Sequence, residues 1–486
     1  MFLELDGDGP LYRQLTRALK DAVLDGRIGA RVLAQELNLS RNTVRTAYDQ
    51  LAAEGFFSGK VGSGSYVAQT PLTKPSRKPA KTVVPQSRYA ARLRSVNKDF
   101  DIGRLHRGLR FNLQYGEPIH DLVAIGAWRR ELAHAASHTS PNYPMAQGVL
   151  SLREAVCEYL LRRRGMTCTP DDVLIVFGTQ QAMTLTVQVL VDPGDAVVIE
   201  DPHYFSARHV GEAHGARIVS VRTDENGLVC KELPGARSGS APGSSSSSPL
   251  KLIFATPSHQ FPGGSLMSMT RRVELLRYAD RHRCWIFEDD YDSEFRYDAQ
   301  PMPALSALDT SGRVIYAGSF SKVMFPSLRM GYVVMPAALR TEFVAAKRIN
   351  DMGCPAIEQA AMARYISSGG FDRHLRRTVQ IAKRRRKTLL EGLERVGLGH
   401  FAVPDSRAGM HAVVWLPYMT HAQCAALIAH ASKRSLGLHP IAPFYKRPPK
   451  MPGLLMGYAS LSATEIEAAL PILAESIRTV VGPARK

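Results

Sequence analysis

Residues 316–332 read YAGSFSKVMFPSLRMGY and place one lysine, Lys322, just after a strand-like apolar run. Two further polar groups follow such runs: the glycine turn GTQQ (178–181) and the acidic cluster EDDYD (288–292). A lysine offers an amine to an aldehyde, a carboxylate keeps a pyridine nitrogen protonated, and helix-start N–H groups bind phosphate. Taken alone, the lysine is more typical of a surface lysine and the turn of an ordinary turn that binds nothing. The acidic cluster alone would suit a metal ion, but no His partner lies at suitable spacing. Together they indicate a site for pyridoxal 5′-phosphate (PLP).

The elements that must position these groups alternate along the chain from about residue 145. Short runs rich in β-branched and aromatic residues are separated by helical runs such as SLREAVCEYLLRR and MTRRVELLRYADRH. Alternation of this kind predicts an α/β domain with a mostly parallel sheet covered on both faces. Ligands of such sheets bind at the carboxyl ends of the strands. The strand-like runs are DDVLIVFG, DAVVIEDP, ARIVSVR, LKLIFATP, CWIFEDD, RVIYAGS and GYVVMP.

The first 68 residues have a different, mostly helical pattern. A helix is predicted over 10–26, and 31–55 reads as helix, tight turn and second helix, with Ser40 as the N-cap of the second. GFFSGKVGSGSYVA (55–68) then predicts a two-stranded wing. An ordinary helical hairpin is the alternative for any one of these pieces. A recognition helix and wing would place the following residues on DNA: Arg41, Asn42, Thr43, Arg45, Lys60 and Ser63.

Charge supports a nucleic-acid partner without proving one. The 486-residue chain has a formal net charge of +18, and such an excess favours polyanions. Residues 69–98 hold eight Lys or Arg, four prolines and neither Asp nor Glu. This composition predicts a basic, semi-extended linker over 69–105 that either contacts phosphates or serves only as a spacer. A second low-complexity stretch, residues 235–249, predicts a flexible surface loop.

Cysteine spacing and hydropathy indicate the class of protein and its location. The six cysteines show neither a CxxC motif nor a Cys/His pairing at metal-ligand spacing, so buried thiols are expected, without disulfides or a metal site. No apolar run reaches the ~18–20 residues of a membrane span, and the N-terminus does not resemble a secretory signal. A cytoplasmic location is expected.

Residues 10–68 resemble the winged helix of GntR-family transcription regulators, above all in SRNTVRTAYDQLAAEGF and VGSGSYVA. The resemblance implies binding to double-stranded promoter or operator DNA. One departure stands out. The family has a PGxRLPSxR-type stretch before the helix-turn-helix, whereas here GRI (26–28) runs almost directly into GARVLAQEL. About eight residues of that pattern are missing, and Arg31 replaces its phosphate-contacting arginine only in part.

Residues 140–480 resemble a fold type I aminotransferase in the form found in the MocR subfamily, where it is fused behind a GntR winged helix. VFGTQQAMTL, IEDPHYFSAR, ATPSHQFPGG, IFEDDYDSEFRY and GSFSKVMFPSLRMGY carry the resemblance. It implies a winged-helix domain over 1–68, the linker over 69–105, and a PLP-binding domain over 106–486. Within the last, the large subdomain spans about 145–340 and the small one about 341–486.

The resemblance also implies roles for individual residues. Lys322 forms the internal aldimine with PLP, Asp289 pairs with the pyridinium nitrogen, Tyr291 bonds the ring hydroxyl oxygen, and Tyr204 stacks on the ring. The phosphate is surrounded by Gly178, Thr179, Gln180, Ser319, Ser321 and Arg329. Tyr143, five residues before Gly148, matches a tyrosine that reaches the phosphate of a partner subunit, which implies a homodimer.

Two functions fit these features. One is a PLP-dependent transcription regulator whose aminotransferase-like domain senses PLP or an amino compound that reacts with it. The other is an active PLP-dependent aminotransferase behind a weakened DNA-binding head. A PLP-binding module with neither activity is a third hypothesis. Aminotransferases clamp the substrate carboxylate with an arginine near the chain's end, where this chain reads PGLLMGYASL (452–461) with Leu454, Leu455 and Met456. Arg447 is a candidate substitute. The missing arginine favours the regulator.

Overall fold

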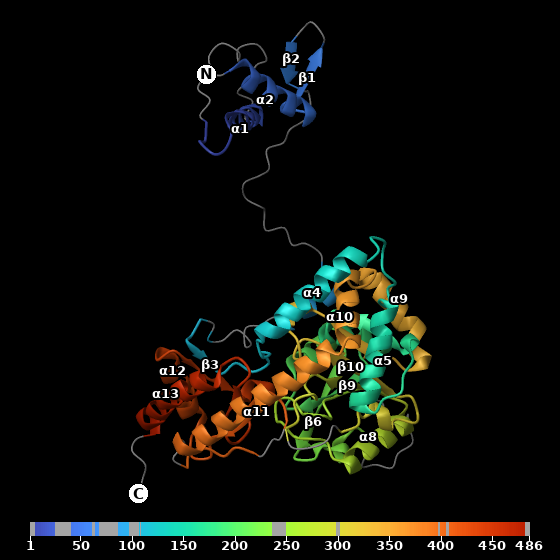
Figure 1. Ribbon diagram of the computed structural model, residues 1–486, viewed down its shortest axis with the longest axis vertical. Helices are drawn as coiled ribbons and strands as arrows, with labels where there is room; N and C mark the ends of the chain where they lie inside the picture. The colour runs from blue at the N-terminus through green and yellow to red at the C-terminus, as the bar shows by residue number, and fades with distance from the viewer. Residues whose placement is uncertain are drawn as a thin grey trace. The chain divides into compact units, whose positions relative to one another are not determined.

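The computed structural model describes residues 5–24, 40–60, 64–67, 86–96, 106, 108–235, 249–297, 302–396, 399–404 and 408–481 (Figure 1). The chain divides into two compact units, Met1–Pro85 and Gln86–Lys486. The predicted first helix of the helix-turn-helix (31–39), Arg31, Ser63 and most of the predicted 235–249 loop lie outside the described residues.

The first unit is a small helical domain with a hairpin. Its elements are α1 (Leu11–Leu24), α2 (Arg41–Ala53), β1 (Phe57–Lys60) and β2 (Gly64–Val67). Ser40 caps α2 as predicted, because its side chain accepts a hydrogen bond from the Thr43 N–H at 3.2 Å. β1 and β2 pair antiparallel, with Lys60 opposite Gly64. One apolar cluster joins the helices to the hairpin: Leu15, Leu19, Val23, Ala47, Leu51 and Phe57.

The second unit is built on an eight-stranded sheet of order β4-β11-β10-β9-β8-β5-β6-β7. Its strands β10, β9, β8, β5 and β6 are parallel, and β11 runs antiparallel to both β10 and β4. The mostly parallel sheet is therefore confirmed. The strands are β4 (Val173–Val176), β5 (Ala196–Asp201), β6 (Arg217–Asp224), β7 (Gly227–Leu228), β8 (Leu250–Ala255), β9 (Trp285–Asp290), β10 (Val314–Ser319) and β11 (Gly331–Val334).

Helices cover both faces of this sheet because successive strand residues point to opposite sides. Val197 and Ile199 pack in the cluster that contains α6 and α9 side chains, whereas Val198 packs in the cluster that contains α8 side chains. The predicted two-sided burial is thus confirmed (Figure 1). The helices around the sheet are α4 (Leu122–His138), α5 (Leu150–Arg164), α6 (Thr179–Leu190), α7 (Phe205–His214), α8 (Met269–His282), α9 (Arg340–Asp351) and α10 (Ala356–Ser367).

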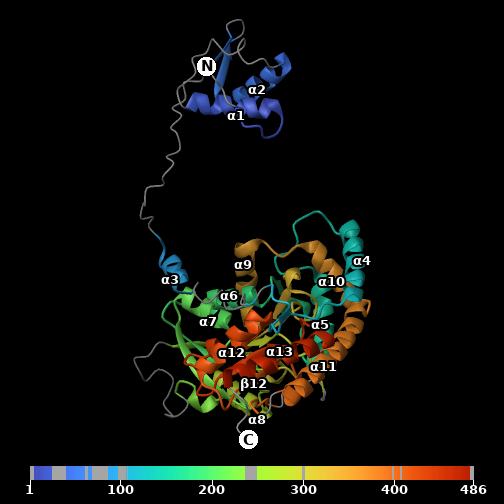
Figure 2. The same ribbon diagram turned by 90° about the vertical axis from the view of Figure 1, so that its left-hand side faces the viewer.

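The C-terminal part forms a smaller sheet of order β12-β15-β14 with three long helices (Figure 2). β3 (Phe111–Asn112) pairs with β13 (Leu436–Gly437), so residues near 111 pack with the end of the chain. The remaining elements are α11 (Gly370–Val396), β12 (His411–Trp415), α12 (His421–Lys433), β14 (His439–Pro440), β15 (Gly453–Gly457) and α13 (Ala463–Val481).

Helix α3 (Arg88–Val96) corrects the predicted linker of residues 69–105. It belongs to the second unit and packs on α7, as Figure 2 shows. Arg92 donates to the carbonyls of Ala213 and His214 at 2.8 and 3.1 Å. Carbonyls in the last turn of a helix lack partners within it, so a nearby arginine is a favourable donor. Arg92, one of the basic residues that suggested a spacer, thus docks helix α3 on α7.

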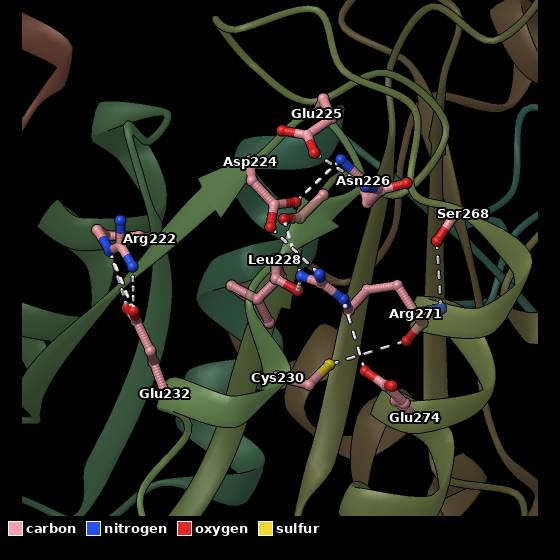
Figure 3. A network of polar contacts seen from close by, with 11 residues as sticks. Arg222, Asp224, Glu225, Asn226, Leu228, Cys230, Glu232, Ser268, Arg271 and Glu274 are labelled. Atoms are coloured by element: carbon pink, nitrogen blue, oxygen red, sulfur yellow. Dashed lines mark hydrogen bonds and ion pairs between the residues drawn. The ribbon is translucent and has the colours of Figure 1, made fainter.

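The β6–β7 edge of the large sheet is fixed by a polar network around Arg271 of α8 (Figure 3). Arg271 donates to the carbonyls of Gly227 and Leu228 and contacts Asp224 at 3.2 Å. Arg222 forms an ion pair with Glu232 on the same edge. Arg271 thus holds the hairpin to α8, and Arg222 ties β6 to the turn that follows β7. In the described part of the chain, no helix is long and apolar enough to cross a membrane.

Candidate functional site

A cavity of about 410 Å³ lies where the strands of the large sheet end. β4, β5, β8, β9 and β10 point the same way, so the loops that follow them meet at one edge. The cavity brings together most of the predicted cofactor residues, which are spread along the chain from residue 179 to residue 329: Thr179, Gln180, Tyr204, Asp289, Tyr291, Ser319, Ser321, Lys322 and Arg329.

One end of the cavity has the character of an anion site. Helix α6 begins at Thr179 after Gly178, whose φ of 75° favours glycine. Arg329 donates to the Phe177 carbonyl at 2.9 Å, and its guanidinium lies 3.7–3.9 Å from the position that a Cβ on Gly178 would take. A helix N-terminus and a guanidinium at the same point favour a bound phosphate.

Asp289, another lining residue, carries an unsatisfied carboxylate oxygen. Its Oδ1 atom is buried and has no hydrogen-bond partner among the described residues. Burial raises the pKa of Asp289 to about 8, with Asp290, Asp292 and Glu200 adding to the rise and Lys322 opposing it. A buried carboxyl without a partner is costly in either ionisation state. A cationic N–H donor in the cavity would satisfy it.

Lys322 lines the same cavity. Burial lowers the pKa of its amine, while Glu117, Asp292 and Asp289 act in the opposite direction. Its Nζ donates a hydrogen bond to the carbonyl of Gly116. A lowered pKa increases the fraction of neutral, nucleophilic amine, which is the form that reacts with an aldehyde.

His259 is a site residue that the sequence analysis missed. Its Nδ1 lies 2.9 Å from both Tyr291 Oη and Asp292 Oδ2. With the proton on Nδ1, the N–H is shared between these two acceptors, and the Tyr291 hydroxyl keeps its own proton for a ligand in the cavity. His259 thereby holds Tyr291 in a donor orientation. The one sequence signal for His259 was its position in ATPSHQFPGG, directly after a predicted strand.

Two other groups of lining residues were also missed. Gln114, Tyr115, Gly116 and Glu117 come from a segment to which no site was assigned, and the pairing of β3 with β13 brings that segment to the cavity. The remaining residues come from helix α7, the small sheet and loops around the cavity: Phe205, Ser206, His209, Phe261, Asp292, Pro326, Met410, His411 and Phe444.

Two predicted residues lie elsewhere. Tyr143 is 88% exposed and does not line the cavity of its own subunit. Arg447, the suggested substitute for the carboxylate-binding arginine, lines a separate cavity of about 730 Å³. His259 lies between the two cavities, because it lines the second and contacts Tyr291, which lines the first. Arg447 is therefore no substitute within the cavity of Lys322.

In the first unit, Asn42 and Arg45 are exposed at the start of α2. The Arg45 side chain is 83% exposed and lies 4.0 Å from Asp49. Thr43 is half-buried, and its hydroxyl lies 2.7 Å from that of Ser40. The side chains of Arg41 and Lys60 lie outside the described residues.

The fold and the site define a winged-helix protein with an aminotransferase-like body. Residues 111–432 match the family model "Aminotransferase class I and II". The chain is 34% identical over 480 residues to the probable rhizopine catabolism regulatory protein MocR of Rhizobium meliloti, covering 95% of this chain and 92% of that one. It belongs to the MocR subfamily of GntR-type transcription regulators.

Two further similarities support this placement. The HTH-type pyridoxine biosynthesis transcriptional regulator PdxR of Corynebacterium glutamicum is 30% identical over 407 residues, covering 83% of this chain and 82% of that one. The structure of Pyrococcus horikoshii kynurenine aminotransferase, solved with pyridoxamine phosphate (PMP), superposes with a TM-score of 0.68 at 25% identity, covering 83% of this chain and 97% of that one. The regulator interpretation is therefore confirmed over that of an enzyme with a vestigial head.

Proposed function

We propose that the second unit binds PLP and that its occupancy changes how the winged helix binds DNA. The observation that carries this proposal is the unpartnered, buried Oδ1 of Asp289 in the same cavity as Lys322. PLP offers the two groups that this cavity lacks: a pyridine nitrogen that can carry a proton, and an aldehyde that condenses with primary amines.

Each predicted residue then has a physical task. Lys322 supplies the amine, Asp289 keeps the pyridine nitrogen protonated, and Tyr291 donates its hydroxyl proton to the ring oxygen while His259 holds it in place. Tyr204, 41% exposed at the cavity, covers a ring face. The phosphate is bound at the start of α6 by Gly178, Thr179, Gln180, Ser319, Ser321 and Arg329.

Tyr143 fits a site completed by a second copy of the chain. It is 88% exposed and is therefore free to contact another subunit, and Met145 beside it is 66% exposed. We expect a homodimer in which this loop reaches the cavity of the partner subunit. Loss of PLP affinity on dilution to monomer would support this arrangement.

Regulation rather than turnover is favoured by the segment that stands where aminotransferases carry their carboxylate-binding arginine. Amino-acid turnover requires a cation for the substrate carboxylate, and the segment 452–461 supplies hydrocarbon instead: Leu454, Leu455 and Met456 are all fully buried. On the DNA side, Asn42 and Arg45 are the described residues at the α2 start that meet the major groove. The relevant readout is therefore operator binding, not transamination.

Cofactor attachment tests the first half of the proposal. Purified protein mixed with PLP, reduced with sodium borohydride and digested should carry the cofactor's mass on the peptide that contains Lys322. Lys322→Ala should carry none, and Lys347→Ala, which removes a buried lysine of α9 outside the cavity, should still be labelled. Labelling spread over surface lysines, or equal labelling of Lys322→Ala, would overturn the assignment.

A further inference from the structure

The segment that stands where aminotransferases carry their carboxylate-binding arginine is apolar and packs against residues that line the cavity. In the small sheet, Val413 lies opposite Leu455, and His411 lies opposite Gly457. Directly opposed residues and residues two apart share a face, so Leu455 is on the same face as His411, which lines the cavity. Leu455 is fully buried in a cluster with Phe261, Val413, Ile441 and Phe444.

Each side chain of the cavity that could carry a positive charge already has another role or contact. Among its described lining residues, the only arginine is Arg329, which sits at Gly178 where the phosphate binds. Lys322 is the reacting amine. Burial lowers the pKa of His411 to about 3, so its ring is neutral, and Nε2 lies 3.1 Å from the carbonyl of Pro262. His209 stacks its ring on Phe205.

The charge that remains in the cavity is negative. Glu117 lines it beside Lys322 and acts on that amine electrostatically. A carboxylate on the carbon next to a bound nitrogen would enter this field without a cation to offset it. Leaving a charge unpaired in a partly buried site weakens binding, whereas removing that charge from the ligand does not.

An apolar or aromatic body has matching partners on the same wall. Phe444 lies between three aromatic rings, with centroids at 5.4 Å from Phe261, 5.4 Å from Tyr115 and 4.7 Å from Phe205. All four line the cavity. Such a group favours hydrocarbon and aromatic ligands through burial and edge-to-face contacts.

We propose that the amino compound sensed by this protein is a primary amine without a carboxylate on the neighbouring carbon, and with an aromatic or branched hydrocarbon body. The proposal rests on the proposed PLP site, because the amine is held next to the cofactor. It narrows the effector to a chemical class: simple arylalkyl and branched alkyl amines, and not the corresponding α-amino acids.

Matched ligand pairs test the proposal. The full-length, PLP-loaded protein is titrated with 2-phenylethylamine and with L-phenylalanine, and with 3-methylbutylamine and L-leucine, while the visible absorbance of the cofactor and the heat of binding are recorded. The amine of each pair should bind about tenfold tighter or more, as expected for one unpaired charge. Equal or tighter binding of the amino acids, or no response to any of the four, would overturn the proposal.

A charge variant sharpens the test. Glu117→Gln removes the negative charge that acts most strongly on Lys322 and should reduce the preference for 2-phenylethylamine over L-phenylalanine several-fold. Glu467→Gln removes an equal charge from an exposed position of α13 and should leave the preference unchanged. Equal preferences in both variants and the wild type would contradict the role of Glu117.

Failure of the underlying site gives a different result. If the wild type shows no cofactor absorbance after mixing with PLP, or if Lys322→Ala takes up PLP with the same spectrum, the PLP site itself is refuted and the inference falls with it. If PLP is taken up through Lys322 but the amino acids bind better, only the effector class is wrong.

Discussion

Replacing Asp289 by asparagine should change how the stability of the cofactor-free protein depends on pH. Burial raises the pKa of Asp289 to about 8 from an ordinary value of 3.8. The folded state therefore keeps a proton that the unfolded chain releases, and the resulting stability is fully present below about pH 4 and lost as the pH rises towards 8. Asparagine has nearly the shape of the protonated carboxyl and does not titrate.

The size of the effect follows from the same values. Each pH unit between the two pKa values is worth about 1.4 kcal/mol, so from pH 5 to pH 8 the wild type should lose about 4 kcal/mol relative to Asp289→Asn. Burial also raises the pKa of Glu200 and of Glu294 to about 7. Both carboxyls are present in both proteins, so the effect of their own burial cancels, and the charge of Glu200 enters the difference only through its contribution to the raised pKa of Asp289.

Urea unfolding followed by tryptophan fluorescence measures this difference. The three tryptophans, at positions 128, 285 and 415, all lie in the second unit, so the signal reports on the unit that holds the cavity. From pH 5 to pH 8 the midpoint of the variant should rise steadily relative to that of the wild type, and at pH 8 the variant should be the more stable. Addition of PLP at pH 8 should stabilise the wild type more than the variant. Parallel midpoint curves from pH 5 to 8 would refute the account of Asp289.

Three further predictions follow from single side chains. Arg329→Gln should weaken PLP about 10- to 100-fold, as for loss of a charge-assisted bond, and should leave the affinity for phosphate-free pyridoxal unchanged in equilibrium dialysis; equal losses for both would place Arg329 elsewhere. Ser40→Ala should destabilise α2 by about 1 kcal/mol, seen as faster hydrogen exchange over residues 41–53 with α1 less affected, and unchanged exchange would deny the cap a role. Arg45→Ala should weaken operator binding and lower the slope of log affinity against log salt concentration by about one. An unchanged affinity and slope would mean that Arg45 contacts only Asp49 and not DNA.

The sequence was sufficient to predict the large sheet and the edge that holds the site. Strands β4, β9 and β10 are short, apolar and β-branched, and Gly178, Asp289 and Ser319 occur where they end, so local pattern and chain order determine their places. Ser40 was predicted for the same reason, because an N-cap is a local feature.

What escaped prediction depends on contacts between distant segments. Gln114 to Glu117 reach the cavity because β3 pairs with β13, more than 300 residues later, and local periodicity carries no trace of that pairing. His259 acts through Tyr291, a relation that only the folded geometry reveals. Helix α3 was mistaken for linker because its stability comes from the Arg92 contacts with α7 rather than from its own pattern.

The central claim is that PLP bound through Lys322 alters DNA binding by the first unit. The most direct test measures the affinity of the full-length protein for DNA from upstream of its own gene and its neighbours, over a salt series, with and without PLP. Sequence-preferring binding that PLP shifts in the wild type, and does not shift in Lys322→Ala, is the predicted result. Binding that ignores PLP in both proteins, or that shifts equally in both, would contradict the account.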